Sequence, residues 1–159
     1  MTTSIRLLSE NDHAAVAVAV LMEEMQAHYS VPCPPRETIL SGLQNRPPGV
    51  ELLIAEDGDS VLGFAAFSAI YPGPWLQPGI FLKDLFVSKR ERGHGLGNTL
   101  MKSLAALAKE RGLGRIDWTA DPDNPRLLAF YNDIGGTRRH DKVFFPAGCS
   151  SVDETRDLN

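Results

Sequence analysis

The sequence contains little cysteine, with only Cys33 and Cys149 among its 159 residues. The two cysteines are far apart and belong to no spacing that holds a metal ion, so we expect no metal cofactor. Cysteine this sparse is typical of proteins that keep their thiols reduced. The sequence therefore predicts a cytoplasmic protein with free thiols.

Strong charge and long apolar runs are also missing. The net charge at pH 7 is −4, whereas a general nucleic-acid-binding protein usually has a basic excess, so we expect no nucleic-acid partner. One local basic stretch is present, at Lys89, Arg90 and Arg92. The chain has no run of about 18 apolar residues and no basic segment followed by an apolar one near residue 1. We accordingly expect no membrane span, no signal peptide and no membrane partner.

What the chain does have is the composition of an ordinary soluble globular protein. Hydrophobic residues make up 43% of the chain and charged residues 23%. A chain of this length buries a sizeable core without disulfides or metals. We expect one domain over residues 1–149, followed by a polar and loose tail over 150–159.

Hydrophobic periodicity predicts the elements in the first half of the chain. Ser9 and Asp12 have the spacing of a capping box, which should start a helix that runs to about Tyr29. Asp57–Asp59 is typical of a hairpin turn. The full set is a strand over 3–8, the helix to Tyr29, a helix over 36–45, and strands over 50–56, 61–71 and 80–87. The last two strands should pair antiparallel.

The second half alternates helices with strands. A helix with leucines on one face begins at a glycine-rich turn, and these are Leu96, Leu100, Leu104 and Leu107. A strand over 115–120 follows, then a helix that Asn124 caps before Pro125, and a final strand over 139–145. The predicted order is β-α-α-β-β-β-α-β-α-β. Because the hairpins are antiparallel and the strand–helix–strand crossover is parallel, the fold class is α/β (α+β) with a mixed sheet.

The glycine-rich turn runs Arg92-Gly93-His94-Gly95-Leu96-Gly97. A strand, such a turn and a helix, in this order, lay backbone N–H groups around a phosphate. A P-loop is excluded because Gly97 is followed by Asn98 rather than lysine. A dinucleotide-binding fold is disfavoured because these glycines are spaced G-x-G-x-G. Two interpretations remain: a pyrophosphate held by turn amides, and a glycine turn that is only structural.

Three motifs resemble a known family. Arg92-x-x-Gly95-x-Gly97, after the strand Asp84–Val87, resembles the acetyl-CoA signature R/Q-x-x-G-x-G/A of the GNAT acetyltransferases. Asp123-Asn124-Pro125, followed by Phe130-Tyr131, resembles that superfamily's later helix, and the element order also agrees. Within the superfamily the likeness is to the diamine (spermidine/spermine) and thialysine N-acetyltransferase branch. The resemblance implies the GNAT acyl-CoA N-acyltransferase fold, with two splayed parallel strands, and a homodimer.

The resemblance also implies acetyl-CoA as co-substrate, bound without a metal. The pantetheine arm would lie along the backbone of Leu85, Phe86 and Val87 like an added strand. Asn124 would contact the cofactor as well as cap its helix. The pyrophosphate would bind the turn, through Arg92, Gly93, His94, Gly95, Leu96, Gly97 and Asn98.

The implied reaction is direct attack by an uncharged primary amine of a small molecule on the thioester. Tyr131 occupies the position of the family's general acid. Asp84 matches an aspartate of the family that is either catalytic or structural. Contacts with the amine substrate are expected from Lys83, Glu24, His28 and Tyr29.

Lys83 departs from the family pattern, because the polyamine branch has a glutamate there. A lysine would repel a polyamine and favour an amine that also carries a carboxylate or phosphonate. Strict strand alternation places Phe81, Lys83, Leu85 and Val87 on one face and Asp84 on the other. Two alternatives stay open: a non-catalytic acyl-CoA-binding module, and an acetyltransferase of protein or peptide amines.

Overall fold

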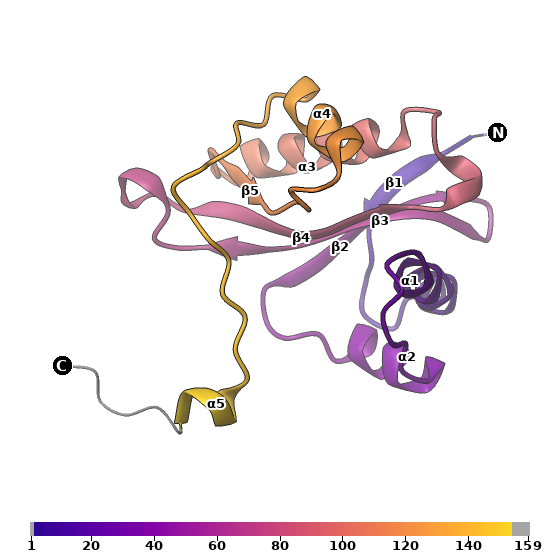
Figure 1. The fold of residues 1–159 in the computed structure, drawn as a ribbon. Helices are drawn as coiled ribbons and strands as arrows, with labels where there is room; N and C mark the ends of the chain where they lie inside the picture. Colours follow the sequence, from indigo (N-terminus) through magenta and orange to yellow (C-terminus); the bar gives the residue numbers. More distant parts are fainter. Residues whose placement is uncertain (1, 154–159) are drawn as a thin grey trace. The chain divides into compact units, whose positions relative to one another are not determined.

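The computed structural model describes residues 2–153. Most of the predicted tail, residues 154–159, lies outside the described residues. The chain divides into two compact units, residues 1–119 and 120–159, which are taken in turn. The single domain predicted over residues 1–149 stays a prediction. The first unit contains a five-stranded sheet in the order β1-β2-β3-β4-β5 (Figure 1).

The sheet is mixed, as predicted. Its first four strands run antiparallel to their neighbours, and β5 (Ile116–Trp118) pairs in parallel with β4. β5 is shorter than the predicted strand over 115–120. The other strands are β1 (Ser4–Leu7), β2 (Val50–Asp57), β3 (Ser60–Ile70) and β4 (Gly79–Val87).

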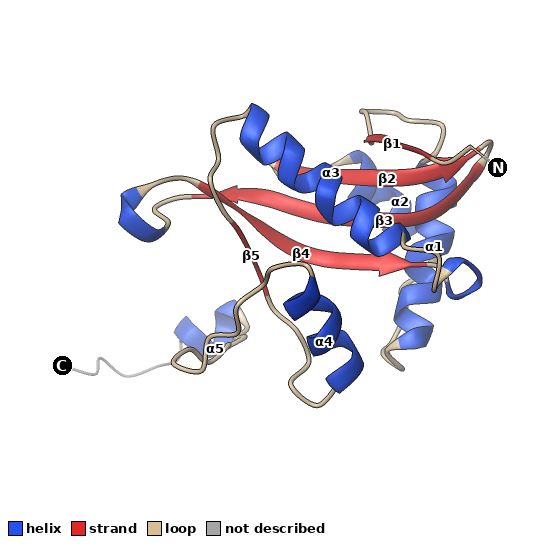
Figure 2. Ribbon diagram, turned by 90° about the horizontal axis from the view of Figure 1, so that it is seen from above, coloured by secondary structure: helices blue, strands red, loops and turns tan. Residues whose placement is uncertain are grey.

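Helices cover both faces of this sheet. α1 (Ala15–His28) and α2 (Arg36–Gln44) lie on one face, and α3 (Leu96–Glu110) lies on the other (Figure 2). Because both faces are covered, β2 is buried at four consecutive residues instead of at every second one. Two short 3₁₀ helices, η1 (Pro74–Leu76) and η2 (Lys89–Glu91), precede and follow β4.

The core between the sheet and α1 is built on aromatic residues of neighbouring strands. Phe64 of β3 and Phe86 of β4 are buried, with ring centroids 6.4 Å apart, in the same cluster as Val18 and Leu21 of α1. Burying one such side chain stabilises the fold by about 1.5–3 kcal/mol. On the opposite face the buried residues of α3 recur at helical spacing, and they are Leu100, Met101, Leu104 and Ala108.

The predicted capping box does not start α1. The helix begins at Ala15 with Ala14 as its N-cap, and no side chain caps it. Ser9 does donate to Asp12, through its backbone N–H (3.0 Å) and its hydroxyl (2.9 Å). The Asp12 carboxylate, however, is held by Arg6 and by the N–H of Ala14, so the chain turns once more before it becomes helical.

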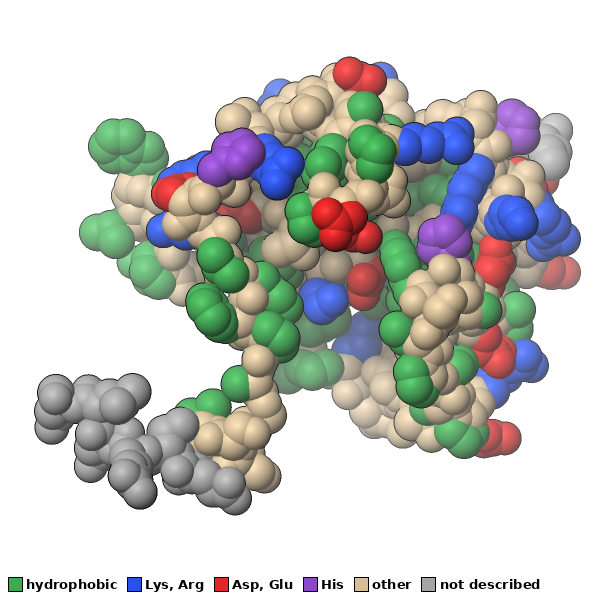
Figure 3. All heavy atoms as spheres, viewed as in Figure 1, with side chains coloured by type: hydrophobic (Ala, Val, Ile, Leu, Met, Phe, Trp, Pro, Cys, Tyr) green, Lys and Arg blue, Asp and Glu red, His purple; other side chains and the backbone are tan. Residues whose placement is uncertain are grey.

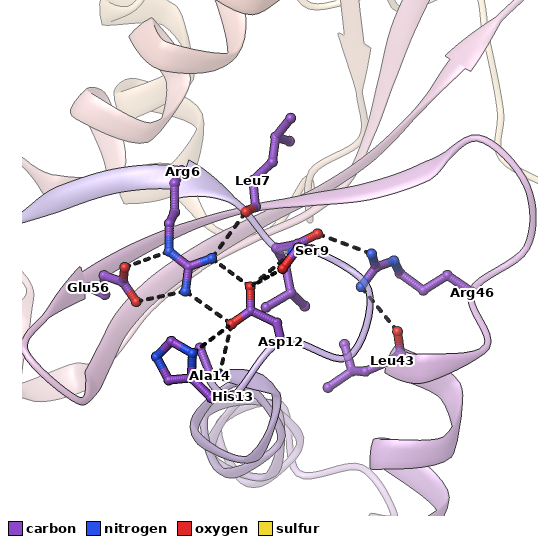
Figure 4. Close-up of polar contacts among 10 residues, drawn as sticks. Arg6, Leu7, Ser9, Asp12, His13, Ala14, Leu43, Arg46 and Glu56 are labelled. Atoms are coloured by element: carbon purple, nitrogen blue, oxygen red, sulfur yellow. Dashed lines mark hydrogen bonds and ion pairs between the residues drawn. The ribbon is translucent and has the colours of Figure 1, made fainter.

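Arg6 joins three segments in the first unit (Figure 4). Its guanidinium donates to both oxygens of Asp12 and to both oxygens of Glu56 on β2. The Asp12 side chain is only 2% exposed, and its hydrogen bonds with Arg6 hold the pKa of its carboxyl far below the ordinary value. The network therefore ties β1 and β2 to the entry of α1.

The second unit contains α4 (Pro125–Asp133), whose N-terminus forms as predicted. Asn124 is the N-cap, and its side chain accepts a hydrogen bond from the N–H of Leu127 at 3.1 Å. Pro125 follows at the first helical position. After the helix, Gly135 has a φ of 101°, which favours glycine and ends the helix.

The predicted strand over residues 139–145 does not form. Residues 139–145 pair with no strand of the described chain, and their apolar side chains Val143, Phe144 and Phe145 are exposed. An apolar sequence favours a strand, but a strand also needs a neighbouring backbone to bond. A short helix, α5 (Cys149–Asp153), occupies the start of the predicted loose tail. The described order is therefore β-α-α-β-β-β-α-β-α-α.

Candidate active site

β4 and β5 pair over only three residues of each strand. Pairing runs from Ile80–Ile116 to Leu82–Trp118, where β5 ends, whereas β4 continues to Val87 (Figure 2). β3 pairs with the last part of β4 on its other side. Within the first unit, the backbone of residues 85–87 is therefore a strand edge that β5 does not cover, and an extended ligand can add to such an edge.

The glycine-rich turn follows directly and leads into α3. Gly93 and Gly95 have φ values of 82° and 79°, and open space surrounds both Cα atoms. Their conformation, rather than crowding, is what requires glycine. Gly95 is the N-cap of α3 and provides no side-chain cap. The first N–H groups of the helix, at residues 96–98, thus lack a side-chain acceptor at its positive end.

Arg92 ties the turn to the end of β4. Its Nε donates to the carbonyl of Val87 at 3.0 Å, and its guanidinium carbon lies 5.2 Å from the centroid of the Phe86 ring. His94, the other predicted turn residue with a titratable side chain, is exposed. The structure thus brings the predicted turn residues and the end of β4 into one continuous segment.

Glu24 of α1 is engaged with the start of the turn. Its carboxylate accepts from the hydroxyl of buried Ser88 at 3.1 Å and from the backbone N–H of Lys89 at 2.8 Å. The sequence predicted Glu24 as a substrate contact and did not identify this link, because nothing local connects residues this far apart. The hydrogen bonds instead give Glu24 a place beside the predicted cofactor turn.

The other two candidates on α1 lie at its C-terminal end. The His28 ring is 4.9 Å from the Tyr29 ring and 5.9 Å from the ring of Phe86 on β4, centroid to centroid. Both residues are exposed. The end of α1 therefore lies near Phe86, two residues after the predicted catalytic residue Asp84 in β4.

A β-bulge in β4 occurs at Lys83. Ala66 of β3 pairs with Asp84, whereas the next residue, Phe67, pairs with Leu82. Lys83 is thus the extra residue, without a partner in β3. Bulges of this kind re-aim side chains and are frequent beside active sites. The sequence signal was the pair of consecutive polar residues inside an otherwise apolar strand.

The bulge makes the predicted face assignment wrong. Phe81 pairs with Ser68, and Asp84 pairs with Ala66, two residues earlier in β3. Paired residues share a face, as do residues two apart, so Phe81 and Asp84 lie on the same face of the sheet. That is the α1 face, since Ala66 packs against the α1 core cluster. Strict alternation failed because it holds only in a strand without an inserted residue.

Asp84 is a partly buried carboxylate beside a lysine. Burial raises the pKa of the Asp84 carboxyl, and the positive charge of Lys83 opposes that rise. The Lys83 Nζ lies 3.9 Å from the Asp84 Oδ1. A carboxyl with a raised pKa in a partly dry environment is suited to accept a proton at neutral pH.

Tyr131 and Asn124 belong to the second unit. Tyr131 lies in α4, half-buried, with its ring centroid 5.4 Å from that of Phe130. Asn124 performs the capping role that the sequence predicted for it. The catalytic role of Tyr131 and the cofactor contact of Asn124 stay predictions.

Comparison with known families decides the class of protein. Residues 18–135 match the family described as Acetyltransferase (GNAT) family, and this range contains β4, the glycine-rich turn and Tyr131. The chain belongs to this family. It is an acetyltransferase, as the motifs predicted, and GNAT enzymes use acetyl-CoA.

Three curated relatives are named for the acetylation of amino acids. Thialysine N-epsilon-acetyltransferase of Caenorhabditis elegans is 27% identical over 125 residues, covering 77% of this chain and 76% of that protein. D-amino-acid N-acetyltransferase HPA3 of Saccharomyces cerevisiae is 26% identical over 130 residues, 79% of each. L-ornithine N5-acetyltransferase NATA1 of Arabidopsis thaliana is 31% identical over 75 residues, only 47% of this chain and 33% of that protein.

Solved structures agree on the fold. An integron cassette protein from the mobile metagenome of V. cholerae has a TM-score of 0.83 and 29% identity, over 96% of both chains. Aminoglycoside N-acetyltransferase AAC(6')-Iy, solved in complex with CoA, has a TM-score of 0.73 over 93% of this chain and 96% of that one. Its identity is 18%, so this second likeness shows the fold alone.

Residues 2–153 contain no group of three His, Cys, Asp or Glu side chains placed to hold a metal ion. No helix in the part of the chain that the structure describes has the length and apolar character needed to cross a bilayer.

Proposed function

We propose that the protein transfers the acetyl group of acetyl-CoA to the primary amine of a small molecule. One observation carries this proposal: β4 continues beyond the end of β5, and the turn that follows β4 leads to the N-terminus of α3, which has no side-chain cap. Residues 85–87 offer a strand edge for the amide-containing pantetheine arm, and the turn amides offer donors for the pyrophosphate. Arg92, anchored to Val87, adds positive charge at the junction.

The reaction releases one proton overall. A primary amine has a pKa of about 10 and is mostly protonated at pH 7, so a base must first take a proton from it. The freed nitrogen lone pair attacks the thioester carbon, a C–N bond forms and the C–S bond breaks. The leaving thiolate takes a proton and the nitrogen loses its second one, which yields an acetamide and the free thiol.

Three groups of this chain are assigned to these steps. Asp84, with its raised pKa, accepts the first proton, directly or through a water molecule. The backbone N–H of Val87 donates to the oxyanion that develops on the acetyl oxygen. Tyr131 protonates the leaving thiolate, and the match of the family model across α4 supports this role.

The class of substrate is supported by the relatives and by Lys83. The relatives named above acetylate thialysine, D-amino acids and ornithine, all of them small amines. Lys83 provides a positive charge where the polyamine branch has a negative one. This favours small amines other than polyamines.

An amine panel separates this function from its rivals. The full chain is mixed with acetyl-CoA and one amine at a time, and the release of free thiol is measured. The amines are ornithine, thialysine, spermidine, an aminoglycoside and a short peptide with a free N-terminus. We expect thiol release with at least one small amine. If acetyl-CoA binds by calorimetry but no amine releases thiol, the protein is a non-catalytic acyl-CoA-binding module. Release with the peptide alone would favour protein amines.

Self-association is a second part of the proposal. The loop between β3 and β4 exposes Tyr71, Trp75 and Leu76, and Trp75 is 93% exposed. Hydrophobic side chains protrude from the molecule where this loop lies (Figure 3). Such a surface is suited to a homodimer contact. Light scattering of the wild type and of Trp75→Ser tests this, and a monomeric wild type would refute the dimer.

A cytoplasmic location is proposed too, consistent with Cys33 and Cys149 being free.

A further inference from the structure

The bulge in β4 places a cation and an anion side by side at an exposed position. The Lys83 and Asp84 side chains are 70% and 38% exposed, and their 3.9 Å separation is near the outer limit of an ion pair. Other pairs are tighter: Arg111 donates to both oxygens of Glu51. Within residues 2–153 neither Lys83 nor Asp84 makes a side-chain hydrogen bond. Both therefore keep donors and acceptors for a ligand.

This juxtaposition depends on the bulge. In a regular strand, consecutive side chains point to opposite faces, and adjacent charges cannot serve one ligand. With Lys83 inserted between the residues that pair with β3, the lysine ammonium reaches the Asp84 carboxylate. The local geometry thus builds a two-charge site out of two neighbours in sequence.

The surroundings leave Lys83 as an available cation. Asp84 shares its face with Phe86, whose ring contacts His28 and the Arg92 guanidinium. The Nε of Arg92 is bound to the end of β4, and the nearby Glu24 carboxylate is occupied by the start of the turn. An incoming carboxylate therefore finds the Lys83 ammonium exposed and paired only loosely with Asp84.

We propose that Lys83 and Asp84 together select zwitterionic amines, that is, amino acids with a free carboxylate. Lys83 binds the substrate carboxylate, and Asp84 binds the ammonium group that will react. A diamine without a carboxylate leaves Lys83 unpaired and brings a like charge toward it. This selection rests on the proposed acetyl transfer, since Asp84 is the base there, but it is a separate property of the substrate site.

Matched substrate pairs test the selection. Ornithine with putrescine, and lysine with cadaverine, differ only by the carboxylate. We expect the wild type to prefer the amino acid of each pair by at least about tenfold in kcat/KM, mainly through KM. Lys83→Glu should reverse the preference and Lys83→Met should abolish it. Lys102→Glu, the same charge change at an exposed position of α3, should leave it unchanged.

Calorimetry of the same pairs, with CoA present, separates the two proposals. If no amine is acetylated but the amino acids bind in a Lys83-dependent way, acetyl transfer fails and the selection stands. If amines are acetylated without preference for the carboxylate, or if Lys83→Glu keeps the wild-type preference, the selection is overturned. Binding of neither member of a pair also overturns it.

Discussion

The carboxylate of Glu24 holds both the hydroxyl of Ser88 and the backbone N–H of Lys89, at 3.1 and 2.8 Å. A residue of α1 thereby fixes the point where β4 ends and the segment leading to the glycine-rich turn begins. Ser88 is buried, so the carboxylate also satisfies a hydroxyl that water does not reach.

Glu24→Ala should therefore weaken acetyl-CoA binding without removing any predicted contact to it. Losing charge-assisted hydrogen bonds worth about 1.5–3 kcal/mol frees the turn, and part of that energy must be restored on binding. We expect an increase in Kd of roughly three- to tenfold by calorimetry. Glu23→Ala is the control, because Glu23 pairs instead with Arg36. Equal affinities of the two variants would contradict an ordering role for Glu24.

Gly95→Ala should also weaken acetyl-CoA binding, by about tenfold or more, since alanine resists a φ of 79° and its methyl group occupies the approach to the helix amides. Gly112→Ala is a closely matched control. Gly112 has a φ of 73°, has open space around it and follows the other end of α3. Both variants should lose similar thermal stability, but only Gly95→Ala should lose affinity. An equal loss of affinity in Gly112→Ala would show that backbone strain in general, and not the position of Gly95, weakens acetyl-CoA binding.

Tyr131→Phe should lower kcat by about 10²-fold, within the range for a lost general acid, with little change in acetyl-CoA affinity. The ring and its packing beside Phe130 are retained. Steady-state thiol release measures this effect. Tyr71→Phe, at an exposed tyrosine outside α4, should behave like the wild type. Near-wild-type turnover of Tyr131→Phe would leave the tyrosine with a packing role only.

The pH dependence of turnover should report Asp84. A general base works when deprotonated, so activity rises with pH through its pKa. Burial raises the Asp84 pKa and Lys83 lowers it, so Lys83→Met should raise the pKa further and move the acid limb of kcat/KM to higher pH. Putrescine, which has no carboxylate, is the substrate to use, since Lys83 does not bind it. An acid limb at the same pH in both proteins would exclude Asp84 as the base.

Asp12→Asn should destabilise the fold by about 1.5–3 kcal/mol at pH 7, because the part-buried hydrogen bonds with Arg6 lose their negative partner. The folded-state pKa of Asp12 is lowered, so its stabilisation is present above the unfolded pKa of about 3.9 and is lost as the pH falls below it. The difference between variant and wild type should therefore shrink below about pH 4. Urea unfolding measures it. Glu51→Gln, at an exposed pair, should cost under about 1 kcal/mol.

Much of the local structure follows from short-range chemistry in the sequence. Asn124 before Pro125 caps α4 because the capping bond spans only three residues. The glycine-rich turn forms where the sequence predicts it, and Gly95 has a positive φ at which a side chain is strained. The leucine spacing of α3 predicts its buried face, since helical periodicity is a property of the helix itself. These local rules were enough to predict the glycine-rich turn, and the resemblance of its motifs was enough to predict the family.

The arrangement of the predicted substrate residues was decided by the tertiary structure alone. The bulge at Lys83 depends on how β3 pairs with β4, and it reversed the predicted face of Asp84 relative to Phe81. The start of α1 depends on the hydrogen bonds that Arg6 donates to Asp12. The predicted strand over 139–145 does not form, because these residues pair with no strand of the described chain. Each of these outcomes is set by a partner that is distant in sequence, which no local pattern encodes. The sequence thus determined the glycine-rich turn and the class of protein, and the packing of distant segments determined how the charges of Lys83 and Asp84 are placed.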